Sequence, residues 1–304
     1  MKNSVLLLLL AVLALGCQNS KTENTGKNTV APKETMSAAD SLKLAKEIEN
    51  FTPENHVSTM NLIFGKPKYD IKNIGILVYD GVNELDVMGP RYVLGQAMGV
   101  KTRLISLKPG NIKTVMGVEI VPNTVIDSVN QLDILIIPGG FKGTIEAAYD
   151  TRLHEWIRKI DQTTKYTGSV CTGGWILGAT GLLKGKRAST NWYKEEAFLK
   201  KYGAVPANER YTQDGKYWTS AGVTAGMDMA LAIMKDIYGE RYAEAIMLDM
   251  EYDPHPPIEG GTPEKTGWVV NWMMESMYDA GVNPLIDSLE KVKNAIPKTT
   301  PKNQ

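Results

Sequence analysis

Thr-Gly-Ser-Val-Cys-Thr-Gly-Gly, residues 167–174, is the stretch that decides the fold of this 304-residue chain. The residues up to Val170 predict a buried strand, and those from Thr172 predict a helix. Cys171 therefore lies on a sharp strand-to-helix turn, the geometry of a nucleophile elbow, in which the reactive atom is exposed above the sheet edge. Glycines beside this turn let the backbone and a substrate approach closely.

The same turn predicts a reactive thiol. The helix that follows points its N-terminus at the sulfur of Cys171, and the partial positive charge there favours the thiolate, which is the nucleophilic form. A free cysteine is more often an inert small hydrophobe. Here the glycines and the position after a buried strand favour a functional cysteine over an inert one.

Around this stretch, apolar runs alternate with amphipathic stretches from Asn73 to Met250. Such alternation is typical of βα units, so we expect a doubly wound α/β fold with a mostly parallel sheet and helices on both faces. The expected strands are 74–79, 102–107, 133–137 and 166–170, with hairpins at 114–121 and 209–219. The expected helices are 87–98, 151–161, 172–180, 191–202, 223–238 and 240–250.

A proline-rich loop follows this region, and a final helix is expected over 263–279. The helix would place Trp268, Trp272, Met273 and Met277 near one face. That spacing is more often core packing or a dimer surface than a ligand site. Beyond Pro284 we expect an amphipathic fragment that fades into a polar tail.

The N-terminal region predicts export. A lysine and the short apolar run from Val5 to Leu15 have the form of a secretion signal, and the run is too short to span a bilayer permanently. The stretch that ends at Cys17, Ala-Leu-Gly-Cys, resembles the bacterial lipobox. We therefore expect a lipid anchor on Cys17 and a domain outside the cytoplasm, in the bacterial cell envelope. The alternatives are a plain cleaved signal and a cysteine buried in a helix.

Composition restricts the classes of partner. Cys17 and Cys171 are the only cysteines, so a lipid on the first leaves the second without a disulfide partner within one monomer. Lys plus Arg and Asp plus Glu both number 34, and a formal net charge of zero disfavours nucleic acid as a partner. The three histidines show no metal-ligand spacing, so no metal site is expected. The loop after the first strand lacks a dinucleotide fingerprint.

Five motifs together resemble the ThiJ/PfpI family of the class I glutamine amidotransferase-like superfamily. They are residues 81–90 (Gly-Val-Asn-Glu-Leu-Asp-Val-Met-Gly-Pro), 138–140 (Pro-Gly-Gly), 171–173, 224–228 (Thr-Ala-Gly-Met-Asp) and 251–254 (Glu-Tyr-Asp-Pro). The resemblance implies a flavodoxin-like fold. It also suggests four segments: a signal peptide over 1–17, a tether with a short helix over 18–70, the family domain over 71–261, and a C-terminal helix with a polar tail over 262–304.

Within the family, the Leu-Asp-x-x-Gly-Pro form is similar to isonitrile hydratases, which implies a cofactor-free mechanism on a small molecule. Cys171 would attack the terminal carbon of an isonitrile, and Asp86 would supply a proton and then help water to add. Thr172 would hold the substrate by its hydroxyl or its amide. The backbone amides of Gly140 and Thr172 would stabilise developing negative charge.

The acid has two candidates. Asp86 also suits the N-cap of the helix that follows it, and Glu84 is the alternative acid because other family branches use a carboxylate in this loop. Asn191 and Trp192 stand where relatives often have His-Trp, and we place both in the substrate site. The absent histidine weakens protease and amidase functions.

Other functions stay open at this point. The family also includes deglycase or glyoxalase-like enzymes that act on reactive carbonyls. A chaperone or a sensing domain in which Cys171 is oxidised is a non-enzymatic alternative. The resemblance also allows a homodimer.

Overall fold

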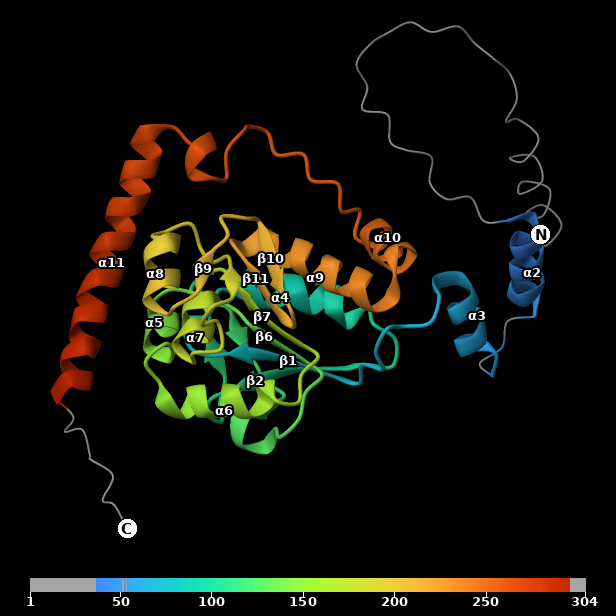
Figure 1. Cartoon of the computed structure of the whole chain (residues 1–304), viewed down its shortest axis with the longest axis horizontal. Coiled ribbons are helices and arrows are strands. Elements are labelled where there is room, and N and C mark those ends of the chain that lie inside the picture. The colour runs from blue at the N-terminus through green and yellow to red at the C-terminus, as the bar shows by residue number, and fades with distance from the viewer. Residues whose placement is uncertain (1–36, 51, 53, 296–304) are drawn as a thin grey trace, which may run out of the picture. The chain divides into compact units, whose positions relative to one another are not determined.

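The computed structural model describes residues 37–50, 52 and 54–295 (Figure 1). Contacts divide the chain into two units, one up to Phe51 and one from Thr52 onward. Helix α2 (Ala38–Glu49) belongs to the first unit and lies within residues 18–70, where a short helix was expected. The signal segment and Cys17 lie outside the described residues.

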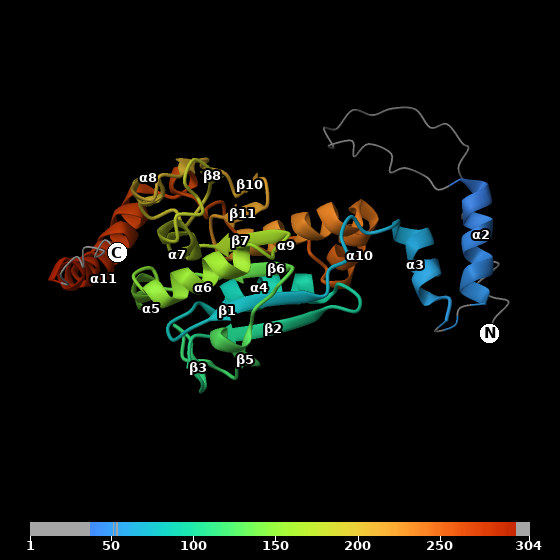
Figure 2. The same cartoon turned by 60° about the horizontal axis from the view of Figure 1, so that its bottom comes forward.

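A seven-stranded sheet forms the centre of the second unit, in the order β10-β11-β7-β6-β1-β2-β5 (Figure 2). The strands of this sheet are β1 (Asn73–Val78), β2 (Lys101–Ser106), β5 (Thr124–Val125), β6 (Ile134–Ile137), β7 (Tyr166–Val170), β10 (Tyr211–Asp214) and β11 (Tyr217–Ser220). All neighbouring pairs are parallel except β10 and β11, which form an antiparallel hairpin. The mostly parallel sheet confirms the expected α/β fold class.

Helices surround the sheet, and two-stranded ladders lie beside it. The helices of this unit are α3 (His56–Phe64), α4 (Glu84–Gly95), α5 (Lys142–Ala147), α6 (Thr151–Asp161), α7 (Gly173–Ala179), α8 (Glu195–Lys201), α9 (Val223–Tyr238), α10 (Glu240–Asp249) and α11 (Trp268–Ala295), with 3-10 turns at Ile126–Ser128 and Pro263–Lys265. The ladders pair β3 (Ile112–Lys113) with β4 (Glu119–Ile120), and β8 (Arg187–Ala188) with β9 (Val205–Pro206). None of the helices in the described part of the chain is long and apolar enough to cross a membrane.

The inner strands form the core because both of their faces are buried: β1 and β6 are mainly apolar, whereas β7 also buries Thr167 and Ser169. β6 reads Ile-Leu-Ile-Ile and is fully buried, and β1 and β7 are buried over nearly their whole length. Burial of both faces is expected for parallel strands covered by helices. Because β1, β6 and β7 are neighbouring parallel strands, their carboxyl ends meet at one edge of the sheet. The segments that follow them there carry the candidate site residues.

Two expected helices were wrong in their bounds. The segment from Asn191 to Lys194 is not helical, and α8 begins only at Glu195. The final helix does not stop at 279 but continues through Pro284 to Ala295. A proline removes one helical hydrogen bond, but Val282 on the same helix is fully buried, and packing of this kind outweighs the local loss. Helix α5 was not predicted, since its six residues are too few to show a period.

Close packing at the sheet edge requires residues without a side chain. A Cβ on Gly173 would lie 2.0 Å from the carbonyl oxygen of Ile137, and a Cβ on Gly143 would lie 1.8 Å from the carbonyl oxygen of Asp80. Both approaches are to backbone atoms, which cannot rotate away. The two glycines thus allow α7 and α5 to begin directly against the ends of β6 and β1.

Gly173→Ala should destabilise the protein by about 3 kcal/mol or more, because overpacking against backbone has no cheap relaxation. Urea unfolding followed by circular dichroism measures the change. Gly260→Ala is the matched control, since a Cβ there meets nothing within 4 Å and the residue has no positive φ. Equal stability of the two variants would contradict the role assigned to Gly173.

Candidate active site

Cys171 has the backbone strain of a nucleophile elbow. Its φ of 56° lies in the left-handed region, which for a residue with a side chain costs about 1–3 kcal/mol. Two hydrogen bonds hold this conformation: the Cys171 amide donates to Ser220 O at 3.0 Å, and Thr190 Oγ1 donates to Cys171 O at 2.7 Å. The strand β11 and the loop after β8 thus fix the turn from two sides.

The thiol is not exposed, contrary to the sequence-based expectation. Only 7% of Cys171 is accessible to solvent. Asn191 is 4% exposed and lies against the sulfur, with Nδ2 3.2 Å from Sγ. The amide of Tyr193 donates to Asn191 Oδ1 at 3.0 Å, which orients the Asn191 side chain so that its NH₂ faces the sulfur. Asn191 can do this because residues 191–194 form a loop and not the expected helix.

Asp86 is fully buried at the start of α4. The N-cap of this helix is Asn83, whose Oδ1 accepts from the amides of Leu85 and Asp86, so Asp86 does not fill the capping role that was its alternative. Asp86 Oδ2 instead accepts a hydrogen bond from the Gly139 amide at 3.1 Å. Among the described residues, no nitrogen or oxygen donor reaches Asp86 Oδ1. This carboxyl therefore has one oxygen left for proton transfer.

Burial dominates the electrostatics of this pair. It raises the pKa of Asp86 to about 7, against the opposing effects of the Gly139 hydrogen bond and the Cys171 thiol, while the Glu84 carboxylate raises it further. Burial and the negative charge of Asp86 also raise the pKa of the Cys171 thiol, although Asn191 and the Thr172 amide oppose this rise. Cys171 and Asp86 therefore hold at least one proton between them at neutral pH.

The expectation of a thiolate favoured by the helix N-terminus is wrong for this site. Helix α7 has only seven residues, and Thr172 at its N-cap makes no side-chain capping bond. The partial charge of so short a helix does not compensate for removing the sulfur from water. The thiol must therefore lose its proton to a neighbouring base when it reacts.

Thr172 and Gly140 bind each other. The Gly140 amide donates to Thr172 Oγ1 at 2.9 Å, and this hydroxyl donates to Gly140 O at 2.8 Å. The Gly140 amide and the Thr172 hydroxyl are thus engaged with each other in this conformation, and the charge stabilisation and substrate binding expected of them stay predictions. The backbone amide of Thr172 lies beside the sulfur and is the remaining donor of the three.

Glu84 lies two residues before Asp86, at the first position of α4. Its Oε2 is buried and has no hydrogen-bond partner among the described residues, and its charge acts on Asp86. The structure gives Asp86 and not Glu84 the interaction with the Cys171 sulfur. Of the two candidates for the acid, Asp86 has the better geometry.

An aromatic cluster of four residues lies beside this pair, and only one of the four was expected from the sequence. The ring of Tyr278 on α11 lies 5.4 Å from that of Trp192, 4.9 Å from that of Tyr193 and 5.5 Å from that of Phe141, measured between centroids. Trp192 was expected at the site, but Tyr278 and Phe141 were not. The apolar face of the expected helix drew attention to Trp268 and Trp272 on α11, which are 79% and 65% exposed. No signal in the sequence marked Tyr278.

The histidines lie elsewhere. His56 Nε2 is 3.3 Å from the sulfur of Met98, and His255 Nδ1 is 2.7 Å from Asp253 O in an exposed loop. Asn191 occupies the position beside the sulfur. Within the described ranges, no group of three or more Cys, His, Asp and Glu side chains could hold a metal ion.

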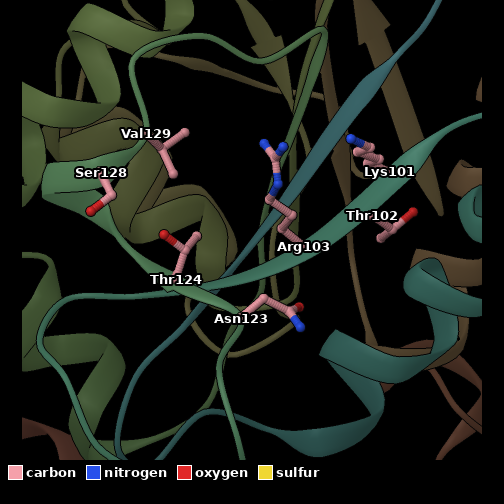
Figure 3. A pocket seen from close by; sticks show the side chains of 7 residues that line it. All are labelled: Lys101, Thr102, Arg103, Asn123, Thr124, Ser128 and Val129. Atoms are coloured by element: carbon pink, nitrogen blue, oxygen red, sulfur yellow. The ribbon is translucent and has the colours of Figure 1, made fainter.

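Cavities away from Cys171 lack a nucleophile. One of about 590 Å³ lies at the β2–β5 edge of the sheet, lined by Lys101, Thr102, Arg103, Asn123, Thr124, Ser128 and Val129 (Figure 3). None of these residues contacts the Cys171–Asp86 pair. Another cavity, of about 460 Å³, is bordered by Trp192 and by the loop before α11. Trp192 is the candidate site residue that lines this second cavity.

Residues 72–236 match the DJ-1/PfpI family. The chain belongs to this family. Isonitrile hydratase of Pseudomonas putida is 35% identical to the present chain over 191 residues, which are 63% of the present chain and 83% of the hydratase. The crystal structure of a ThiJ/PfpI family protein from Pseudomonas syringae superposes with a TM-score of 0.69 and 32% identity, covering 79% of this chain and 95% of that one.

The family also contains regulators. CdhR, an HTH-type transcriptional regulator of Pseudomonas aeruginosa, is 28% identical over 141 residues, which are 46% of this DJ-1/PfpI chain and 41% of the regulator. Family membership alone therefore does not establish a reaction.

Asp86→Asn should shift the pH profile of Cys171 alkylation by iodoacetamide to lower pH. The Asp86 carboxylate raises the pKa of the thiol, so an uncharged side chain of the same shape removes that repulsion and leaves more thiolate at each pH. Alkylation rates from pH 6 to 10 would be measured by intact mass spectrometry. A shift to higher pH would show that Asp86 acts on the thiol mainly as a base.

Proposed function

We propose that this chain is a hydratase of the isonitrile hydratase type, which adds water to a small, largely apolar isonitrile and releases an N-substituted formamide. The observation that carries the proposal is the buried Cys171–Asp86 pair, which holds a proton beside a nucleophilic sulfur without any histidine. The 35% identity to isonitrile hydratase supports the same reaction. We propose that no cofactor takes part.

In the first half of the reaction, the proton of the pair is transferred to the substrate. Asp86 accepts the thiol proton, and an electron pair of the Cys171 sulfur attacks the terminal carbon of the isonitrile. Asp86 then gives that proton to the same carbon, which forms a thioimidate bound to Cys171. A pKa of about 7 suits Asp86 to both transfers at neutral pH, since it is neither fully protonated nor fully ionised.

In the second half, Asp86 is ionised and can remove a proton from water. The water oxygen attacks the thioimidate carbon, the carbon–nitrogen π pair moves to nitrogen, and nitrogen takes a proton. The carbon–sulfur bond then breaks, with its electron pair returning to sulfur, and the formamide leaves. Asn191 Nδ2 and the Thr172 amide face the sulfur, so both are placed to stabilise the departing thiolate.

An activity on reactive carbonyls is the alternative enzyme function, and DJ-1 homologues among the relatives support it only at the level of the family. Oxidation of Cys171 in a sensing domain is the non-enzymatic alternative. Burial of the thiol and its raised pKa weigh against rapid oxidation, which requires an accessible thiolate. Isonitrile hydration begins with a proton shared between thiol and acid, which this pair provides, and it therefore fits this site best.

The place of action is a second proposal. We propose that acylation of Cys17 anchors the chain in a bacterial cell envelope, with the hydratase domain outside the cytoplasm. The support is the sequence that ends at Cys17, which resembles a lipobox. Residues between this cysteine and the domain would serve as a tether.

Incubation with cyclohexyl isocyanide should yield N-cyclohexylformamide, followed by mass spectrometry. Cys171→Ala should abolish turnover because the nucleophile is lost. Asp86→Asn should reduce kcat by at least about 100-fold, the lower end of the effect of one general acid–base group. Met116→Ala is a suitable control, since that side chain is 80% exposed. Turnover that survives in Cys171→Ala would overturn the mechanism, and no turnover by the unsubstituted protein would overturn the substrate.

Cys17→Ser should abolish incorporation of radiolabelled palmitate when the full chain is expressed in a bacterium, and it should move the protein from the membrane fraction to the soluble fraction. The sulfur of Cys17 would be the lipid attachment point, and serine cannot form the thioether. Cys171→Ser, which leaves the N-terminal region intact, is the matched control. Equal labelling of the Cys17→Ser variant and the unsubstituted chain would overturn the anchor.

A further inference from the structure

Helix α11 brings the ring of Tyr278 against the loops beside the Cys171–Asp86 pair. Tyr278 packs between two loops that flank the elbow: Phe141 follows β6, and Trp192 and Tyr193 follow β8. Asn191, which binds the sulfur, belongs to the second of these loops. The ring of Tyr278 is therefore fixed on three sides next to the residue that contacts the nucleophile.

The position of α11 is set by two carboxylates on the helix. Asp279 Oδ1 accepts from Tyr193 Oη at 2.6 Å and from Lys194 Nζ. Three turns later, Glu290 Oε1 accepts from Tyr149 Oη at 3.0 Å and from Lys201 Nζ at 2.8 Å. Between them, Gly281 lies against Phe141 so closely that a Cβ would come within 2.5 Å of its ring. The contacts of Asp279 and Gly281 adjoin Tyr278 and hold it at the site, whereas Glu290 binds the distant end of the helix.

The Tyr278 hydroxyl is coupled to the reactive groups. Burial is the main cause that raises the pKa of Tyr278, the charges of Cys171 and Asp86 raise it further, and a hydrogen bond with the Asn191 side chain opposes the rise. The phenol is therefore protonated throughout the neutral range and is available as a donor. In the second half of the reaction the substrate nitrogen needs a proton while Asp86 takes one from water, and a second proton donor beside the pair lets both transfers occur together.

We propose that Tyr278 is a catalytic residue that donates a proton to the substrate nitrogen during hydration of the thioimidate. This inference rests on the proposed hydratase function. As water attacks carbon, the carbon–nitrogen π pair takes the Tyr278 proton, and Asp86 takes the proton of the water. When the carbon–sulfur bond breaks, the hydroxyl proton of the intermediate returns to the Tyr278 phenolate. Cys171 and Asp86 are left with one proton, as before the cycle.

The aromatic cluster gives the same assignment a steric reason. The nitrogen of a thioimidate is one bond beyond the carbon attached to sulfur, and its substituent extends further. The rings of Phe141 and Trp192 pack against Tyr278 beside Asn191, and an apolar surface of this kind favours a small apolar substituent over water. A substrate bound in this direction presents its nitrogen to the Tyr278 hydroxyl.

Tyr278→Phe tests the assignment, because phenylalanine keeps the ring and removes only the hydroxyl. With cyclohexyl isocyanide, we expect kcat to fall on the order of 100-fold, as for loss of one general acid. KM should not rise, and the thioimidate should accumulate. Intact mass spectrometry after rapid quenching would detect it as protein plus one substrate molecule. Iodoacetamide alkylation of Cys171 should proceed at nearly the rate of the unsubstituted protein, since the nucleophile is intact.

Tyr149→Phe is the matched control. It also removes a hydroxyl that holds α11, but at Glu290, about 18 Å along the helix from Tyr278 at 1.5 Å per residue. We expect it to leave kcat within about twofold and to give no covalent accumulation. A similar loss in both variants would mean that Tyr278 acts only by holding α11, which overturns the proposal.

The remaining outcomes are also decisive. Full kcat in Tyr278→Phe, or a fall in kcat with no accumulated adduct, would overturn the role of Tyr278 while the hydratase function stands. No turnover and no adduct with the unsubstituted protein would overturn the hydratase function, and the role of Tyr278 falls with it. Accumulated thioimidate in Tyr278→Phe alone, with slow release of formamide, is the result that supports both.

Discussion

The loop after β6 touches the turn after β7 at a distance that leaves no space for a side chain. A Cβ on Gly139 would lie 2.6 Å from the Thr172 amide nitrogen, and one on Gly173 would lie 2.0 Å from Ile137 O. This contact places the Gly139 amide against Asp86 and the Gly140 backbone against Thr172. The relative positions of Cys171, Asp86 and the Thr172–Gly140 pair all follow from this contact. The glycines are needed for the conformation of the site. They do not act on a substrate themselves.

Burial gives the site its chemistry through a balance of opposing effects. Removing Cys171 and Asp86 from water disfavours both charges, while their own hydrogen bonds to Asn191, Thr172 and Gly139 partly restore them. The outcome is a pair that keeps a proton at neutral pH. An exposed thiolate would be the better nucleophile in isolation, but it would also be open to oxidants. A buried pair reacts only when a substrate that can accept the proton enters, and this is the behaviour that addition to an isonitrile carbon needs.

The whole of α11 lies beyond the segment that matches the family, which ends at residue 236. Nevertheless, the helix contributes Tyr278 to the aromatic cluster and Asp279 to the contact with Tyr193. Trp268 and Trp272 on the same helix are exposed, so this part of α11 does not pack into the core. The segment that matches the family contains Cys171, directly after β7, and Asp86, in the first turn of α4. A segment remote in sequence then closes the surroundings of the sulfur and provides the aromatic environment, which is where members of one fold can differ in the molecules they accept.

The sequence by itself determined the α/β class, the elbow at Cys171, and Asp86 and Asn191 as candidate site residues. These features depend on local patterns: a buried apolar strand, glycines at a turn, and a short motif at fixed spacing. Only the tertiary structure decided which capping residue α4 uses, that the thiol is buried with a raised pKa, and that Thr172 and Gly140 are engaged with each other. It also decided that Tyr278 joins the site. Hydrogen-bond partners, solvent exclusion and contacts across more than one hundred residues arise when the chain packs, so no local pattern encodes them.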